Sequence, residues 1–125
     1  MTAPDLLAAA DALLTGGAPR LLGCWQRVCA ALIRTALETT LEGFWQQRAP
    51  GVVGTTMRTQ LLILPLVAGA AAGVTARRAW NGLSWAVHHH SYELPPNAAE
   101  LRSWYDDVTE LSAQLARSAE AHGER

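Results

Sequence analysis

Apolar residues recur at intervals of three and four along almost the whole chain, and this spacing limits the possible folds more than any other feature. Near the end of the sequence these positions are Leu101, Trp104, Val108, Leu111 and Leu115. Steps of three and four place side chains on one face of an α-helix, and no segment shows the two-residue alternation typical of a half-buried strand. The sequence therefore predicts an all-α protein, an antiparallel up-and-down helical bundle of four to five helices.

Capping residues mark where these helices begin. Thr2 and Asp5 have the spacing of a helix-capping pair before the first helix. Asn97 and Glu100 repeat that spacing before the last one. A threonine at 55 or 56 is placed to cap the third. The predicted helices cover residues 4–14, 19–48, 56–67, 75–89 and 98–118.

Proline and glycine are expected to interrupt the second half of the bundle. Pro65 is predicted to kink or end the third helix, because proline lacks the backbone N–H that an inner helical position needs. The alanine and glycine run over 68–73 then acts as a connector to the fourth helix. At the end of the chain, residues 119–125 are expected to fray.

The composition indicates one small folded unit. The chain has 125 residues, of which 50% are hydrophobic and 17% charged, and its formal net charge is −1. This balance excludes a disordered acidic or basic tail. The length fits a single domain, residues 1–125, with a core over about 4–118. All ten cationic side chains are arginine and 23 residues are alanine, which indicates a GC-rich, bacterial coding sequence.

Two segments predict a cytoplasmic protein with no membrane partner. Residues 59–76 carry no charge, but Pro65 interrupts them, and the apolar part is shorter than the ~20 residues that a membrane-spanning helix needs. The N-terminus lacks the basic start and long apolar core of a signal peptide.

Cys24 and Cys29 lie ~140° apart around a helix, which disfavours a disulfide between them. We expect both to be buried thiols in a reducing compartment.

The small net charge hides an uneven distribution. No acidic residue occurs between Glu42 and Glu93, and four arginines give that stretch a charge of +4. From Glu93 onward, seven acids and three arginines give −4. The basic segment fits phosphate, which a guanidinium binds through two parallel hydrogen bonds. It fits equally well an ion pairing with the acidic last helix, either within the fold or across a dimer.

The predicted helix over 75–89 carries the most unusual group of polar residues. Steps of four, three and four align one polar stripe, which consists of Arg77, Asn81, Ser84 and His88. The adjoining stripe consists of Arg78, Trp85 and His89. Trp85 lies ~140° from Trp80 around the helix and outside the predicted core, so we expect Trp85 and His89 to form an interface.

The three consecutive histidines allow more than one interpretation. Histidine titrates near neutrality, so these side chains and Tyr92 can act as acid and base in the cleavage of an RNA phosphodiester. Equally, one histidine packs, one caps the helix and one is solvated. Consecutive histidines point ~100° apart on a helix, which disfavours a shared metal ion; no metal or cofactor is predicted. The candidate catalytic residues are His88, His90 and Tyr92. The candidate RNA- or phosphate-binding residues are Arg77, Arg78, Asn81 and Ser84.

Two segments resemble a HEPN domain (higher eukaryotes and prokaryotes nucleotide-binding), an all-helical family of bacterial toxins, antiphage proteins and their accessories. One is ALETTLEGFW over 36–45, which is similar to the Leu-Glu-rich second helix of that family. The other is LSWAVHHHSYEL over 83–94, followed by a helix with a proline and asparagine cap. The layout matches over 21–115.

The family places an Arg-x(4–6)-His motif at the end of the corresponding helix, and this chain departs from it. None of the residues at the required spacing before His88, His89 or His90 is arginine, and Arg78 lies ten residues before His88. The resemblance implies a homodimer in which arginine and histidine from two subunits form a metal-independent ribonuclease site. Without the arginine, it implies a degenerate member that does not cleave RNA.

The function expected from this resemblance is a self-associating binding or regulatory component of a bacterial defence or toxin–antitoxin system. Its partners would be a second copy, RNA or a nucleotide, and a protein encoded nearby. One alternative is a metal-independent ribonuclease toxin of the HEPN type, in which Arg77 or Arg78 replaces the missing arginine. Another is a helical protein–protein adaptor unrelated to that family.

Overall fold

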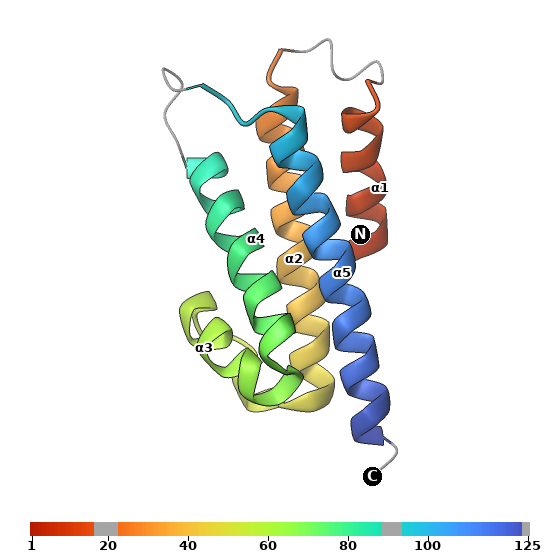
Figure 1. Cartoon of the computed structure of the whole chain (residues 1–125), viewed down its shortest axis with the longest axis vertical. Coiled ribbons are helices and arrows are strands. Elements are labelled where there is room, and N and C mark those ends of the chain that lie inside the picture. Colours follow the sequence, from red (N-terminus) through yellow and green to blue (C-terminus); the bar gives the residue numbers. More distant parts are fainter. Residues whose placement is uncertain (17–22, 89–93, 124–125) are drawn as a thin grey trace.

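The computed structural model describes residues 1–16, 23–88 and 94–123, and within these ranges it contains five α-helices and no strand. The elements are α1 (Ala3–Leu14), α2 (Trp25–Arg48), the short 3₁₀ helix η2 (Pro50–Val52), α3 (Met57–Ala68), α4 (Ala70–His88) and α5 (Ala98–Gly123). Four of the α-helices, α1, α2, α4 and α5, lie side by side and run alternately up and down (Figure 1). The shorter α3 lies against the lower half of α4. The predicted all-α antiparallel bundle is confirmed.

Both predicted capping pairs are formed. The Thr2 hydroxyl accepts a hydrogen bond from the Asp5 backbone N–H at 3.3 Å, and the Asp5 carboxylate accepts one from the Thr2 N–H at 3.1 Å. At the start of α5, the Asn97 side chain accepts from the Glu100 N–H at 2.8 Å, and Glu100 accepts in return from the Asn97 N–H at 3.1 Å. Each pair satisfies two donors at a helix start, where no intrahelical partner exists.

The start of α4 differs from the prediction, whereas the end of α3 lies within one residue of it. α3 continues past Pro65 to Ala68 and ends at Gly69, whose φ of 99° is a left-handed conformation that favours glycine. α4 begins at Ala70, so the expected connector is its first turn. The reason is a close contact: the Pro65 ring packs where a Cβ on Gly73 would stand. This packing offsets the hydrogen bond that proline removes, and alanine, the best helix former, extends α4 backward.

Two further helix ends and one cysteine also correct the prediction. α2 begins at Trp25, because Gly23 has a φ of 80° and breaks the helical conformation; residues 19–22 of the predicted helix lie outside the described residues. α5 extends to Gly123 instead of fraying from 119, since Ala119–Ala121 are good helix formers. Cys29 is buried as expected, but Cys24 precedes α2 and is exposed.

One apolar cluster joins all five α-helices, with α2 at its centre. α2 alone contributes the fully buried Ile33, Leu37, Leu41 and Trp45. Small residues let the other helices approach closely: six core positions in α2 and α4 are alanine, and a Cβ on Gly82 of α4 would overlap the Trp104 indole of α5. None of the helices in the described ranges combines the length and apolar composition needed to cross a membrane. The bundle leaves the outward face of α4 free to carry polar groups.

Candidate functional site

The outward face of α4 carries the polar stripe that the sequence predicts. Arg77, Asn81 and His88 are exposed on it. Ser84 is half-buried, and its hydroxyl has no hydrogen-bond partner within the described part of the chain. Trp85 is 45% exposed, which agrees with its predicted position outside the core. Three more of the predicted residues, His89, His90 and Tyr92, lie outside the described residues.

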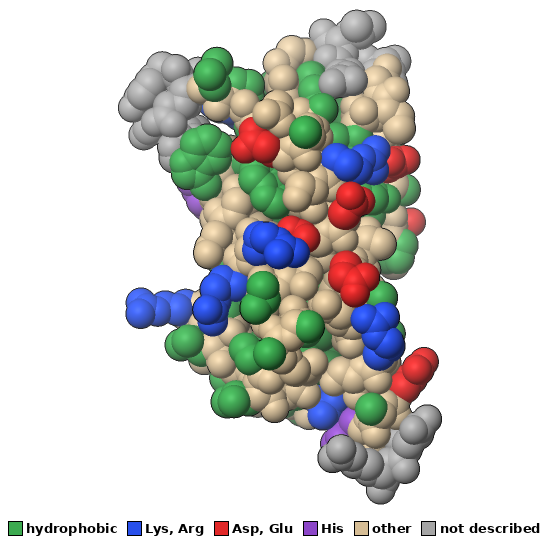
Figure 2. Space-filling model, in the orientation of Figure 1, with side chains coloured by type: hydrophobic (Ala, Val, Ile, Leu, Met, Phe, Trp, Pro, Cys, Tyr) green, Lys and Arg blue, Asp and Glu red, His purple; other side chains and the backbone are tan. Residues whose placement is uncertain are grey.

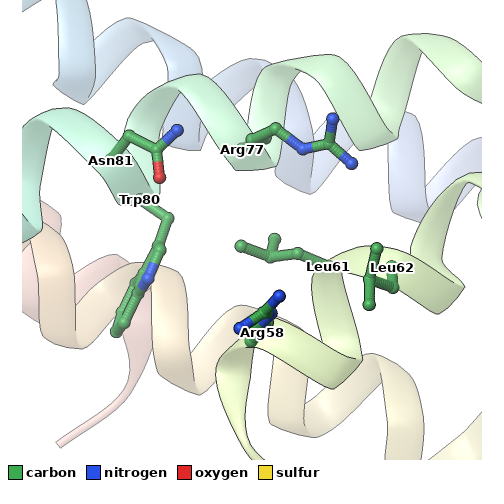
Figure 3. A pocket seen from close by; sticks show the side chains of 6 residues that line it. All are labelled: Arg58, Leu61, Leu62, Arg77, Trp80 and Asn81. Carbon is green, nitrogen blue, oxygen red and sulfur yellow. The ribbon is translucent and has the colours of Figure 1, made fainter.

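A cavity of about 220 Å³ lies between α3 and α4. Its lining consists of Arg58, Leu61 and Leu62 from α3 and of Arg77, Trp80 and Asn81 from α4. In Figure 3, Arg77 and Asn81 project from one side of the cavity, while Arg58 and the two leucines project from the other, and the Trp80 indole closes one end. Two of the residues predicted to bind phosphate therefore meet an arginine from a second helix.

The lining of this cavity is cationic and apolar. Arg58 and Arg77 are both exposed, and neither forms an ion pair with an acidic side chain of the described ranges. Among the described residues, no carboxylate lines the cavity. An anion that enters it meets two guanidiniums, whose planar donors match the oxygens of a phosphate, beside an aromatic ring. The arrangement can bind a phosphate-bearing aromatic ligand.

The other two arginines of the basic segment are used within the fold. Arg78 binds the buried carboxylate of Asp107 on α5 through two hydrogen bonds, 2.7 Å and 3.1 Å long. That hydrogen bonding, together with the negative charge of Asp107, raises the pKa of Arg78. Arg48 donates to the Ser118 carbonyl at 3.4 Å. For Arg78, the intramolecular pairing with the last helix is therefore the interpretation that the structure supports.

Behind the cavity, Arg34 of α2 forms a cluster that the sequence analysis missed. Its Cζ lies 4.5 Å from the centroid of the Trp80 ring. Its Nη1 lies 3.1 Å from Nε2 of His88, and its Nε lies 3.5 Å from a carboxylate oxygen of Glu38. A pair at this four-residue spacing is typically solvated, but the Arg34 side chain is only 21% exposed. The stack on Trp80 shelters it, and helical spacing on α2 alone does not reveal a partner on α4.

Sequence reasoning also did not place Trp80, Arg58, Leu61 and Leu62 in the site. Arg58 and the two leucines lie on α3, whereas every predicted site residue falls within 77–92. The signal that could have found Arg58 is its position in the acid-free segment, which also contains Arg77. Over the described ranges, no three His, Cys, Asp or Glu side chains are grouped as a metal site requires.

Comparison with known proteins was made at the level of families, curated sequences and solved structures, and none of the three finds a match to this chain.

Proposed function

We propose that this protein is a non-catalytic, HEPN-like binding component that holds a segment of single-stranded RNA between α3 and α4. The observation that carries the proposal is the position of Arg58 and Arg77 on opposite sides of a cavity whose described lining includes the Trp80 ring and no carboxylate. Phosphate contacts from arginine supply affinity, and base stacking on an aromatic side chain is tolerant of sequence.

The size of the cavity supports a ligand no larger than one nucleotide unit at this point. Its volume of about 220 Å³ is below the ~300–1,000 Å³ typical of pockets for whole small molecules. A base and its phosphate, as part of a longer strand that continues over the surface, fit this volume better than a dinucleotide cofactor. The Asn81 amide adds a donor and an acceptor for a base edge.

The biological role follows from the resemblance stated above. α4 lacks the arginine that the family's cleavage motif needs, which supports binding without cleavage. In this proposal the protein self-associates and regulates a bacterial defence or toxin–antitoxin system, together with a protein encoded nearby. Its location is the bacterial cytoplasm.

RNA binding can be tested by fluorescence anisotropy of a short, fluorescein-labelled single-stranded RNA. We expect Arg58→Gln and Arg77→Gln each to weaken binding and to reduce the slope of log affinity against log salt by ~0.7 per lost phosphate contact. The matched control is Arg117→Gln on α5, which removes an exposed arginine paired with Glu110. Competition by AMP but not by inorganic phosphate would show that the base contributes. Equal salt slopes for the Arg77 and Arg117 variants would contradict the proposal.

A second candidate function, metal-independent RNA cleavage, is favoured by one contact. Arg34 lies 3.1 Å from His88, so α2 brings an arginine to the histidine at the end of α4. If these residues cleave RNA, the full chain degrades RNA in EDTA, and both Arg34→Ala and His88→Ala abolish the activity. His122→Ala, at the far end of α5, serves as the control. Intact RNA at high protein concentration would exclude this candidate and leave the binding function untouched.

A further inference from the structure

The outward face of α3 carries exposed apolar side chains that lie outside the core of the bundle. Arg58, Leu62 and Leu66 follow one another at steps of four along it, and Leu62 and Leu66 are 62% and 86% exposed. Val74 of α4, 60% exposed, lies one turn beyond the α3–α4 connection. Figure 2 shows hydrophobic side chains gathering at this lower end of the molecule, whereas acidic side chains follow α5. Grouped exposed apolar side chains of this size indicate a contact surface.

The two flanks of α3 carry opposite charges. On the α4 side lies the cavity with Arg58 and Arg77. On the α2 side lies a second cavity, of about 270 Å³, which is lined by Glu38 and Glu42 together with residues of α3 and of the loop before it. Both glutamates are exposed. The face centred on α3 is therefore apolar in the middle, basic on one side and acidic on the other.

A face with this pattern is complementary to itself. In a two-fold symmetric dimer, the axis lies in the interface, and the left flank of one copy contacts the right flank of the other. If the axis runs parallel to α3, the leucines of both copies meet in the middle. The arginine flank of each copy then faces the glutamate flank of the other, which gives two sets of opposite-charge contacts for one interface.

We propose that the protein forms a symmetric homodimer through this α3 face, with Leu62 and Leu66 at its centre and Arg58 opposite Glu42 of the second copy. The inference deepens the self-association in the proposed function and rests on that part of it, not on RNA binding. It places the interface on α3 rather than at Trp85, which lies eleven residues beyond Val74 on α4, or ~16 Å at 1.5 Å per residue.

The same charges disfavour two other occupants. An anionic membrane would attract the arginine flank but repel the Glu38 and Glu42 carboxylates on the other side of the same helix. RNA that extended over the whole α3 face would meet the same repulsion from these two carboxylates. A second copy satisfies the apolar centre and both flanks at once.

The test is sedimentation velocity of the full chain over a concentration series, with circular dichroism to confirm that each variant stays helical. We expect a concentration-dependent dimer. Leu66→Ser should weaken it by about tenfold or more, because a leucine at the interface centre loses its burial on both copies. Leu94→Ser is the matched control, since Leu94 is equally exposed, at 88%, but lies before α5. A dimer unchanged by Leu66→Ser would overturn the proposal.

Charge reversal gives the sharper test. Arg58→Glu and Glu42→Arg should each weaken the dimer by about tenfold through like-charge contacts, and the double variant Arg58→Glu with Glu42→Arg should restore it, because both pairs are then reversed. Failure of the double variant to recover, or a dimer lost in Trp85→Ala but not in Leu66→Ser, would place the interface elsewhere and overturn the inference.

Two further outcomes separate this inference from the proposed function. Trp80→Ala should lower RNA binding and leave the dimer intact. If the parent chain does not bind RNA but the double variant restores the dimer, only the RNA proposal is overturned. If the chain stays monomeric at all concentrations but binds vesicles of phosphatidylserine and phosphatidylcholine through Leu66, the dimer proposal is overturned and this face binds a lipid surface instead.

Discussion

Nη1 of Arg34 lies 3.1 Å from Nε2 of His88, although 54 residues separate the two in the chain. An arginine side chain only donates hydrogen bonds, so Nε2 of His88 is the acceptor in this contact. The same guanidinium stacks on Trp80, which lines the cavity between α3 and α4 together with Asn81. Arg34 therefore holds the position of the Trp80 ring from behind.

Replacement of Arg34 tests this support. We expect Arg34→Gln to lower the free energy of unfolding by about 1–2 kcal/mol, because it removes a sheltered stack on Trp80 and the contact with His88. Arg117→Gln, which removes an exposed pair on α5, should stay within about 0.5 kcal/mol of the parent. Urea unfolding followed by circular dichroism measures both. Equal effects of the two changes would show that Arg34 has no structural role.

Arg77 and Arg78 are neighbours with opposite expected phenotypes. Arg78→Gln should destabilise the fold by about 1–3 kcal/mol, since it leaves the buried Asp107 carboxylate without its partner. Arg77→Gln should leave stability within about 0.5 kcal/mol and lower RNA binding. Urea unfolding and RNA anisotropy on the same two preparations test the pair. The assignment fails if Arg78→Gln weakens RNA binding more than Arg77→Gln does.

Gly82 is predicted to tolerate no side chain. A Cβ there would overlap the Trp104 indole, so Gly82→Ala should cost about 1–3 kcal/mol through overpacking between α4 and α5. Gly43, also inside a helix, has nothing within 4 Å of its Cβ position. Gly43→Ala should therefore stabilise the fold by about 0.5–1 kcal/mol. Thermal unfolding of both variants gives the comparison, and a stabilised Gly82→Ala variant would contradict the close packing.

The first helix should contribute a pH dependence at the acidic end. Hydrogen bonds from the Thr2 backbone and hydroxyl lower the pKa of Asp5 below its ordinary value of 3.8. A carboxyl whose pKa is lowered by folding adds stability above its unfolded pKa and loses it as the pH falls through the folded value. NMR titration of the Asp5 carboxyl should show the lowered pKa, and Thr2→Ala should raise it. A titration at or above 3.8 in the parent would refute the capping contribution.

The fold could be predicted from periodicity and capping because these are local properties. Thr2 with Asp5, and Asn97 with Glu100, act within one helical turn, and both pairs form as expected. The start of α4, which depends on tertiary contact, was predicted wrongly, because α4 begins at Ala70 and not at residue 75. Pro65 interrupts an isolated helix, but here its ring packs on Gly73 of the next helix, and α3 continues past it.

The site could be predicted only in part for the same reason. Arg77 and Asn81 follow from the spacing on one helix, and both line the cavity. Arg58 and Arg34 come from other helices, and their distances to Trp80 and His88 depend on how the helices pack. Sequence spacing also did not separate Arg77 from Arg78, because only the packed structure brings Asp107 next to one of them.

The position of α3 between an arginine-lined cavity and a glutamate-lined one has a consequence for regulation. In the two proposals made above, RNA and the second copy both contact the Arg58 guanidinium, so they would compete for it. Thermodynamic reciprocity then requires RNA to weaken dimerisation by the same factor by which dimerisation weakens RNA binding. Scarce protein would hold RNA as a monomer, and abundant protein would release it. The concentration of the protein would thus determine how much RNA stays bound.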